Sequence, residues 1–284
     1  MITVGIAGLG LIGGSMAKSY KANSDSVVYG FDIDSATVGF AKLSGVIDGE
    51  LNDDTVKECD VIFVALYPFA TIDYMEKIAP LLRKEQIIID LCGTKKEVCR
   101  EGFRLAEKYG FTFVGGHPMA GTHFSGFKYS KSEMFKGAPM VIVPPRYDDI
   151  AFLDGIKQLL SPAGFGSITV TTAEKHDEVI AFTSQLAHIV SNAYVKSPTA
   201  KTHKGFSAGS YKDLTRVAWL NENMWSELFL ENREPLISEL DCIIENLSKY
   251  RDAISDGNKD ELRDLLRDGR ERKEQIDGSM KLKK

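Results

Sequence analysis

Residues 2–13 read ITVGIAGLGLIG, an apolar run that passes directly into three glycines with the spacing G-x-G-x-x-G. This pattern predicts a buried strand, a tight turn at Gly8, and a helix that begins near Leu11. In such a turn Gly10 lets a pyrophosphate approach the backbone, and Gly13 lets the helix pack closely against the strand. The helix also directs N–H groups and the positive end of its dipole at the phosphates. The stretch therefore predicts a dinucleotide-binding site.

A second apolar run, residues 27–31, ends on Asp32, nineteen residues past Gly13. Its carboxylate can accept hydrogen bonds from both hydroxyls of an adenosine ribose. It would repel the 2′-phosphate of NADP, and residues 33–35 supply no arginine to receive that phosphate. We therefore predict NAD as the cofactor, bound by Gly8, Gly10, Leu11, Ile12, Gly13 and Asp32. The alternative is that Asp32 only caps the helix expected near Ser35.

Length and composition exclude several classes of protein. With 284 residues, 43% apolar and 26% charged, the chain is long enough for one large or two ordinary globular domains. A net charge of −5 gives no electrostatic basis for binding nucleic acid. The longest uncharged run, residues 61–72, contains Pro68 and is too short to span a bilayer. The four cysteines form no CxxC pair, and no His/Cys cluster has metal-ligand spacing, so we expect free thiols and no metal. Because the first strand begins at residue 2, we expect no signal or transit peptide, and a cytoplasmic protein.

Apolar runs alternate with helical stretches up to residue 172. The expected strands are residues 2–7, 27–32, 60–66, 86–91, 111–116, 139–143 and 167–171. Their continuous Val/Ile/Phe content is typical of central strands that are covered on both faces. Helical candidates such as 69–82 and 95–108 complete βαβ units between them. We therefore predict an α/β fold in which residues 1–172 form an N-terminal doubly wound, Rossmann-type sheet.

Residues 173–284 are predicted to form an all-helical C-terminal dimerisation domain. One long helix is expected over 173–196, and a Gly/Ser-rich loop, 205–210, precedes another helix. Further on, apolar residues recur at alternating steps of four and three: Leu236, Leu240, Ile243, Leu247, Tyr250 and Ile254. This heptad seam can pack within one chain, but we favour a two-fold homodimer. The charged end, 263–284, is expected to be frayed or to lie on the surface.

His117 is the strongest candidate for acid–base chemistry. A nicotinamide enzyme needs a group that handles the substrate's proton while the cofactor takes the hydride. His117 follows the expected strand 111–116 at the carboxyl edge, where ligands bind in doubly wound folds, and glycines flank it. Its imidazole can accept a hydroxyl proton near neutral pH. The alternative is a structural histidine bonded to a neighbouring loop.

Two pairs of polar residues share helix faces in the C-terminal half. Ser184 and His188 are four residues apart on the long helix, and Lys212 and Arg216 are four apart on the next. The guanidinium fork of an arginine is suited to a substrate carboxylate. Spacing alone does not separate these roles from an ordinary solvated helix face.

The remaining histidines and tryptophans carry weaker signals. His176, in a first helical turn, and His203, in a loop, are interpreted as ordinary residues. One or both of Trp219 and Trp225 are expected in the core, although Trp225 could also line a cleft.

Four segments in this order resemble the prephenate dehydrogenase family of tyrosine biosynthesis, including its arogenate-using relatives. They read GLGLIGGS at 8–15, GHPMAGT at 116–122, SQLAH at 184–188 and KDLTR at 212–216, with Met224-Trp225 downstream. The resemblance covers nearly the whole chain and is far more specific than the glycine fingerprint alone. It implies oxidative decarboxylation of prephenate to 4-hydroxyphenylpyruvate, in which hydride passes to NAD and the ring carboxylate leaves as carbon dioxide.

The resemblance also implies roles for individual residues. His117 would accept the hydrogen bond and proton of the ring hydroxyl, while His188 and Arg216 would bind the substrate, with Arg216 facing a carboxylate. The cleft would further be lined by Thr122, Ser184, Lys212 and Trp225.

The chain departs from the family pattern at two positions. Gly93 replaces a serine that commonly supports the catalytic histidine, so that support would come from Thr94, a backbone group or water. We also place Thr94 among the cofactor-binding residues. His123 stands where a glutamate often follows Thr122, which bears on how the site entrance is gated.

Three other functions remain open. The substrate could be arogenate, which differs from prephenate by an amino group in place of a keto group. The chain could be a β-hydroxyacid dehydrogenase with a catalytic lysine on the long helix, although Lys175 and Lys196 lie at the two ends of that helix. It could also be a non-catalytic NAD-binding regulator that dimerises through its helices.

Overall fold

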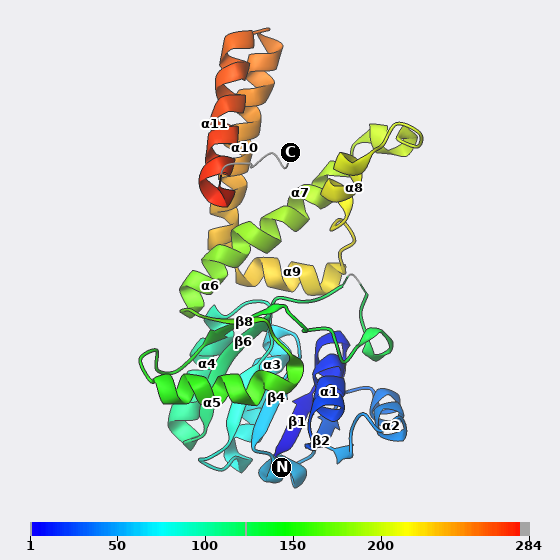
Figure 1. Ribbon diagram of the computed structural model, residues 1–284, viewed down its shortest axis with the longest axis vertical. Helices are drawn as coiled ribbons and strands as arrows, with labels where there is room; N and C mark the ends of the chain where they lie inside the picture. The colour runs from blue at the N-terminus through cyan, green and yellow to red at the C-terminus, as the bar shows by residue number, and fades with distance from the viewer. Residues whose placement is uncertain (1, 123, 279–284) are drawn as a thin grey trace. The chain divides into compact units, whose positions relative to one another are not determined.

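The computed structural model describes residues 2–122 and 124–278 (Figure 1). The chain divides into two compact units, Met1–Arg233 and Glu234–Lys284. The first unit contains the sheet and the helices that follow it as far as residue 233, and the second is built from two helices. The functional boundary expected between residues 172 and 173 stays a prediction.

The first unit is built on one eight-stranded sheet with the order β3-β2-β1-β4-β5-β6-β7-β8. The strands are β1 (Thr3–Ala7), β2 (Val27–Phe31), β3 (Gly49–Glu50), β4 (Val61–Val64), β5 (Ile87–Asp90), β6 (Thr112–Pro118), β7 (Pro139–Val143) and β8 (Ser167–Val170). Strands β1 to β6 run parallel, β7 is antiparallel to β6, and β8 is parallel to β7. The predicted doubly wound α/β sheet is confirmed, and the two-residue strand β3 is an addition to it.

The register places the carboxyl ends of the parallel strands in one row. Ala7 of β1 lies opposite both Phe31 of β2 and Val64 of β4, and Val64 lies opposite Asp90 of β5. The loops that follow these four residues therefore share one edge of the sheet. The end of β6, with His117, extends this edge on the other side of β5.

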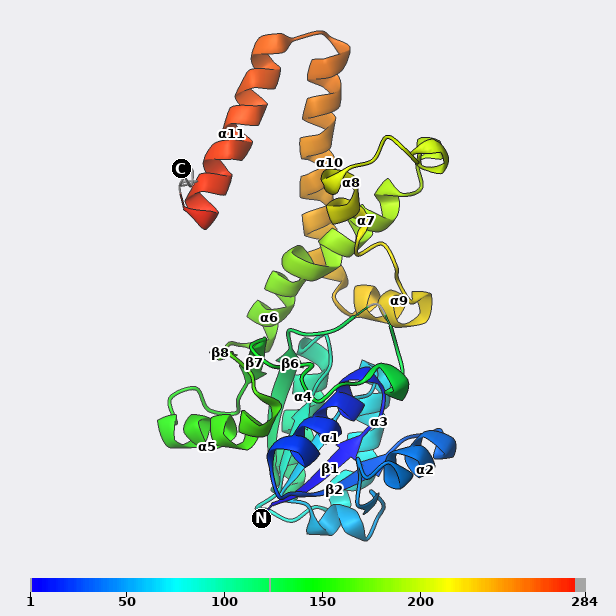
Figure 2. The ribbon, with the colours of Figure 1, turned by 45° about the vertical axis from the view of Figure 1, so that its right-hand side comes forward.

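Helices cover both faces of the sheet, with α1 and α5 on one face and α3 and α4 on the other (Figures 1 and 2). The helices of this unit are α1 (Leu11–Asn23), α2 (Ser35–Leu43), α3 (Pro68–Ile78), α4 (Lys96–Tyr109), α5 (Ile150–Leu160), α6 (Ala173–Ile180), α7 (Ala187–Tyr194), α8 (Gly209–Thr215) and α9 (Glu222–Glu231). Two apolar cores result, because the strand residues bury side chains on both sides. Strand β4 is buried along its whole length.

Capping residues fix where several helices begin. The Asp34 side chain accepts a hydrogen bond from Ala36 N at the start of α2, and Thr172 accepts one from Lys175 N at the start of α6. Asn221 does the same at the start of α9. Each cap satisfies an N–H group that has no partner inside the helix.

The long helix expected over 173–196 is not uniform. A π-helical segment, Ala181–Leu186, joins α6 to α7, and α7 ends at Tyr194. In a π-turn the backbone bonds skip one more residue than in an α-helix, so the faces of the two flanking helices are offset. Periodicity in the sequence does not reveal such a segment, because apolar residues occur on both sides of it.

The second unit consists of most of α10 (Arg233–Ser255) and of α11 (Lys259–Asp277). Helix α10 confirms the helix predicted from the heptad seam. Of the two expectations for the charged end, fraying is wrong up to residue 277, because Asn258 caps α11 through Glu261 N, whereas its place on the surface agrees with the exposure of α11. Ion pairs at spacings of three and four then stabilise its exposed surface, for example Arg272–Asp268 at 2.8 Å.

Within residues 2–122 and 124–278, none of the helices combines the length and apolar character needed to cross a membrane.

Candidate active site

The glycine turn after β1 has the shape that a pyrophosphate needs. Gly8 has φ +88°, and a Cβ there would lie 2.5 Å from the carbonyl oxygen of Ala65. A Cβ on Gly13 would lie 1.8 Å from the Gly8 oxygen, so both positions require glycine. A Cβ on Gly10 would instead meet no described atom within 4 Å, so this part of the turn is open to a ligand.

Leu11 and Ile12 form the first helical turn beyond Gly10, and no described side chain caps that turn. Its N–H groups are therefore available to an anion, as the sequence predicts.

Asp32 joins the end of β2 to the glycine turn. Its Oδ2 accepts a hydrogen bond from Leu9 N at 2.8 Å, and its Oδ1 accepts one from Asp34 N at 3.0 Å. The alternative role as the cap of α2 is wrong, because Asp34 is the residue that caps this helix. A carboxylate oxygen can accept more than one hydrogen bond, so Asp32 retains capacity for ribose hydroxyls.

His117 is hydrogen-bonded to a second histidine. Its Nδ1 lies 2.9 Å from Nε2 of His176, and Nδ1 of His176 lies 2.7 Å from Oδ1 of Asp177. His176 and Asp177 are buried in the first turns of α6, whereas His117 is half-buried at the end of β6. The three side chains form a continuous row from the interior to the edge of the sheet.

The position of each proton follows from Asp177. An ionised carboxylate only accepts hydrogen bonds, so Nδ1 of His176 donates to it and Nε2 of the neutral ring is an acceptor. Nδ1 of His117 must then donate to that acceptor. Nε2 of neutral His117 is left with a lone pair, which is the form that a proton acceptor requires.

Both histidines are held in the neutral form. Burial lowers the pKa of His117 well below its ordinary value, and nearby His176 and Lys95 act in the same direction. Burial also lowers the pKa of His176, although its hydrogen bond to Asp177 opposes the change. His117 is therefore able to accept a proton at neutral pH and below.

Asp177 is itself held by the start of α4. Its Oδ1 accepts from Lys95 N at 2.7 Å and its Oδ2 from Lys96 N at 2.9 Å. The side chain of Lys95 is fully buried and forms an ion pair with Asp90. Asp90 in turn accepts a hydrogen bond from Gly116 N at 3.1 Å. This network connects β5, β6, α4 and α6 beneath His117, so the imidazole rests on rigid elements.

The support of His117 differs from each of the three expectations for it. A Cβ on Gly93 would lie 3.3 Å from Cδ2 of Leu228, because α9 packs closely over this glycine. Neither Thr94 nor a backbone group holds Nδ1 of His117; His176 does. The interpretation of His176 as an ordinary residue is therefore wrong. Its position beside Asp177, directly after the last strand, was the available signal in the sequence.

A second group of predicted residues lies on α7, α8 and α9. Nδ1 of His188 lies 2.8 Å from the carbonyl oxygen of Ser184, so this nitrogen donates and Nε2 is left as the acceptor. The rings of His188 and Trp225 lie against each other with centroids 4.1 Å apart and planes tilted by 31°. Burial lowers the pKa of His188, the hydrogen bond to Ser184 opposes this change, and the positive charge of Arg216 lowers the pKa further. Two of the predicted side chains, those of His188 and Trp225, are thus in contact.

Helix α9 connects this second group to the His117 row. Gln185, in the π-helical segment, donates to the Leu228 carbonyl at 3.0 Å. Asn232, just after α9, donates to the carbonyl of Asp177 at 2.8 Å and to the Gln185 side chain at 2.7 Å. The element that carries Trp225 is therefore fixed to the elements that carry His176 and Ser184.

Several other predicted residues are exposed. Thr122 is exposed in the loop after β6, where its hydroxyl accepts from Phe124 N at 3.3 Å, and Lys212 is exposed on α8. Of the two tryptophans, Trp219 is 76% exposed and is not a core residue, whereas Trp225 is half-buried. His123 lies outside the described residues.

The two lysines of the β-hydroxyacid dehydrogenase hypothesis lie at the two ends of the helical segment formed by α6, the π-helical residues and α7. Lys175 is in the first turn of α6 and pairs with Glu178 at 2.8 Å, and Lys196 lies beyond the end of α7.

Thr94 forms a contact that the sequence did not suggest. Its hydroxyl, buried in the loop after β5, donates to Oε2 of Glu231 at 2.5 Å. Burial raises the pKa of Glu231 to about 7.

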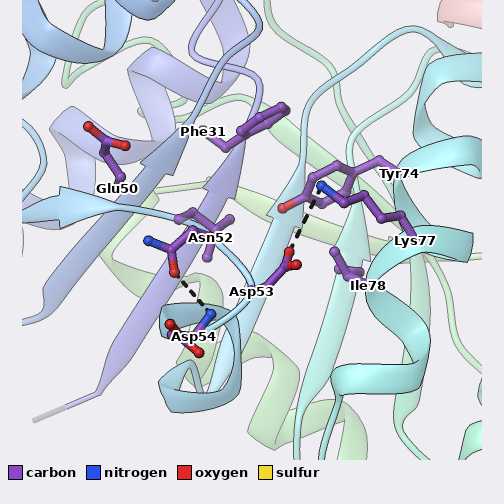
Figure 3. Close-up of a pocket in the computed structure, with 9 residues that line it drawn as sticks. Phe31, Glu50, Asn52, Asp53, Asp54, Tyr74, Lys77 and Ile78 are labelled. Carbon is purple, nitrogen blue, oxygen red and sulfur yellow. Dashed lines mark hydrogen bonds and ion pairs between the residues drawn. The ribbon is translucent and has the colours of Figure 1, made fainter.

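A separate cavity lies beside the end of β2 (Figure 3). It measures about 460 Å³ and is formed by the end of β2, the segment 50–54 and α3. The ring of Phe31 stacks on Tyr74 with centroids 5.4 Å apart, and Lys77 pairs with Asp53 across the opening. Because Phe31 immediately precedes Asp32, this cavity belongs to the β2 side of the edge rather than to the surroundings of His117.

Comparison with known proteins identifies the family of this chain. The family model "Prephenate dehydrogenase, nucleotide-binding domain" matches residues 16–169, and "Prephenate dehydrogenase, dimerization domain" matches residues 172–268. The prephenate dehydrogenase of Bacillus subtilis is 31% identical over 270 residues, which cover 92% of this chain and 72% of the relative. The cyclohexadienyl dehydrogenase of Zymomonas mobilis is 30% identical over 269 residues, which cover 91% and 90% of the two chains.

A solved structure has a similar fold. The prephenate dehydrogenase from A. aeolicus, in complex with hydroxyphenyl propionate and NAD+, is similar with a TM-score of 0.82 and 27% identity, covering 97% of this chain and 98% of that one. The match to the nucleotide-binding model covers most of the sheet, and the match to the dimerization model begins just before α6 and ends within α11. On these grounds the chain belongs to the prephenate dehydrogenase family of oxidoreductases and carries the family's nucleotide-binding and dimerization domains.

Proposed function

We propose that this chain catalyses the NAD-dependent oxidative decarboxylation of prephenate to 4-hydroxyphenylpyruvate. The observation that carries the proposal is the hydrogen bond from Nδ1 of His117 to His176, which leaves Nε2 of His117 as an acceptor at the sheet edge. The resemblance of the chain to prephenate and cyclohexadienyl dehydrogenases supports the substrate class.

The reaction balances without any further reactant. NAD, when bound, takes the hydride from the ring carbon that carries the hydroxyl. The ring carboxylate leaves as carbon dioxide, and its bonding electrons enter the ring, which becomes aromatic. The hydroxyl proton passes to Nε2 of His117 and returns to the same oxygen of the phenol product. Aromatisation drives this sequence without a metal.

His117 contributes as the proton acceptor. When Nε2 takes the proton, the imidazolium that forms is stabilised through His176 by the carboxylate of Asp177. As the hydride leaves, the hydroxyl becomes a ketone, and transfer of its proton to His117 prevents positive charge from building up on that oxygen. His176 and Asp177 do not touch the substrate in this account; they position His117 and fix its tautomer.

Cationic and polar groups hold the substrate, which is a dianion. Arg216 faces a carboxylate, and Nε2 of His188 is available for a second polar contact because Nδ1 is used by Ser184. The cleft is further lined by Thr122, Ser184, Lys212 and Trp225. Both exposed cations, Lys212 and Arg216, lie on the same side of α8 and favour an anionic ligand.

The cofactor is held at the β1 and β2 ends of the edge. Gly8, Gly10 and Gly13 shape the turn for the pyrophosphate, with the N–H groups of Leu11 and Ile12 at the start of α1. Asp32 accepts the ribose hydroxyls and disfavours a 2′-phosphate, so NAD is preferred to NADP. Thr94 lies farther along the same edge, after β5.

The active protein is a homodimer through its C-terminal helices. Helix α10 exposes a row of apolar side chains at steps of seven and three, and such a row is suited to a second copy of the same helix. The row consists of Ile237, Ile244, Leu247 and Ile254, which are 48%, 57%, 59% and 64% exposed in the single chain.

A four-way assay tests the proposed function. Purified protein is given prephenate or arogenate together with NAD or NADP, and NADH or NADPH formation is followed by fluorescence. We expect turnover with prephenate and NAD, and a lower kcat/KM with NADP because of Asp32. Turnover of arogenate but not of prephenate would show that arogenate is the substrate. Equal kcat/KM for the two cofactors would show that Asp32 does not select NAD. If neither substrate is turned over, the proposed function is wrong.

A further inference from the structure

Helix α9 spans the loops that follow β4 and β5. Oε1 of Glu227 accepts a hydrogen bond from Phe69 N at 3.2 Å, in the first turn of α3 after β4. One turn later, Glu231 accepts the hydroxyl of Thr94, which follows β5. Leu228, between them, packs on Gly93. One face of α9 therefore covers the ends of two adjacent central strands.

This is the part of the edge that a dinucleotide has to cross. The glycine turn follows β1 and His117 ends β6, and the strand order between them is β1-β4-β5-β6. A dinucleotide that reaches from the glycine turn to His117 passes the ends of β4 and β5, beneath this face of α9. Its nicotinamide is the reacting end, so it belongs on the side of β5 and β6, where Glu231 lies.

The Glu231 carboxyl group has no ion-pair partner among residues 2–122 and 124–278. Its Oε2 is bonded to Thr94, while Oε1 is a buried atom that has no hydrogen-bond partner in the same part of the chain. Lys95, whose positive charge acts on Glu231, is itself paired with Asp90. A buried charge that lacks a partner is costly, and here the partner is missing at a site where a ligand is expected.

We propose that Glu231 is a binding residue for the positively charged ring of the oxidised nicotinamide, and that it makes the site prefer the oxidised to the reduced cofactor. The inference rests on the proposed use of NAD. The oxidised ring carries one positive charge and attracts the ionised carboxylate, whereas the reduced ring is neutral and leaves the carboxylate again without a partner. The reduced product therefore binds less tightly than the oxidised cofactor, which helps the product to leave.

The ionisation of Glu231 gives this preference a pH dependence. Burial raises its pKa to about 7, the Thr94 hydrogen bond and Lys95 oppose the rise, and Glu227 and Asp177 add to it. Below this pKa the carboxyl is neutral and has no attraction for the charged ring. The affinity for NAD+ is therefore expected to increase between about pH 6 and about pH 8, while the affinity for NADH does not.

The test is a set of binding measurements that need no turnover. Dissociation constants for NAD+, NADH and ADP-ribose are measured by calorimetry on the full chain, on Glu231→Gln and on Glu222→Gln. Glutamine keeps an oxygen for the Thr94 hydroxyl, and Glu222 is an exposed acid on the same helix. We expect Glu231→Gln to weaken NAD+ binding roughly 10- to 100-fold, to leave ADP-ribose and NADH binding unchanged, and to remove the pH dependence. Glu222→Gln should behave as the unmodified chain.

Two results would overturn the inference. An unchanged ratio of NADH to NAD+ dissociation constants in Glu231→Gln would show that the carboxylate does not sense the ring charge. An equal loss for all three ligands would show that Glu231 only supports the local fold. Failure of the unmodified chain to bind NAD+ at all would instead contradict the proposed function, so the two ideas are tested separately.

Discussion

The Asn variant at His117 is expected to lower kcat by about 10²–10⁴-fold, which is the usual contribution of a positioned proton acceptor. An asparagine amide can still form a hydrogen bond near His176, but it cannot take a proton from the substrate at neutral pH. The ring hydroxyl would then have to lose its proton to water. Initial rates of NADH formation at saturating prephenate measure the effect.

A comparison variant separates the loss of a base from the loss of binding. Arg216→Ala removes a charge that we assign to substrate binding, so it should mainly raise KM rather than lower kcat. NAD+ binding, measured by calorimetry, should be retained in both variants because neither residue belongs to the glycine turn. An unchanged kcat in His117→Asn would remove this residue from the mechanism.

Replacing Asp177 with asparagine should lower kcat by an amount on the order of 10²–10⁴-fold, although Asp177 does not touch the substrate in our account. If the new amide N–H₂ group faces His176, it requires Nδ1 of that ring to accept, so that Nε2 carries the proton. His176 then donates to Nδ1 of His117, and Nε2 of His117 becomes a donor instead of an acceptor. In the opposite amide orientation the N–H₂ group faces Lys96 N. Because Lys96 N is also a donor, no hydrogen bond can form between the two groups.

The matched control is Glu178→Gln, which removes a negative charge from the next position of α6. Glu178 is exposed and pairs with Lys175, so its loss leaves the histidine row intact. A merely structural role for Asp177 would lower the melting temperature and leave the kcat of the folded fraction unchanged. That result, together with a normal pH profile of kcat/KM, would contradict the tautomer argument.

The parts of the fold that follow from local backbone chemistry were predictable from the sequence. Gly8 and Gly13 are required by close contacts within the turn itself, and the apolar strands need cover on both faces. The carboxyl edge is then the place where we expect the cofactor, and Arg216 and His188 were recognisable only through their motifs. The two-residue strand β3 carries too few residues to form any pattern.

The support of His117 could not be derived because it depends on tertiary contacts. His117 and His176 are fifty-nine residues apart, and they meet only because α6 begins at the same edge where β6 ends. Glu231 was missed for a similar reason, since nothing in the sequence near it indicates a bond to Thr94. The π-helical segment and the helix α11 were also missed. A charged stretch forms a stable helix when its pairs fall at spacings of three and four, as in α11.

In the proposed mechanism, Asp177 and His176 keep His117 neutral, with its proton on Nδ1 and its lone pair on Nε2. A nitrogen-15 NMR titration of the histidine-labelled protein reads both nitrogens of each ring directly, with His117→Asn providing the assignment. The ordinary pKa of a histidine is about 6.5. We predict that at this pH His117 is still neutral, with the hydrogen on Nδ1, and that it becomes charged only at lower pH. A His117 ring that is protonated in half of the molecules at this pH, or that carries its hydrogen on Nε2, would contradict this assignment.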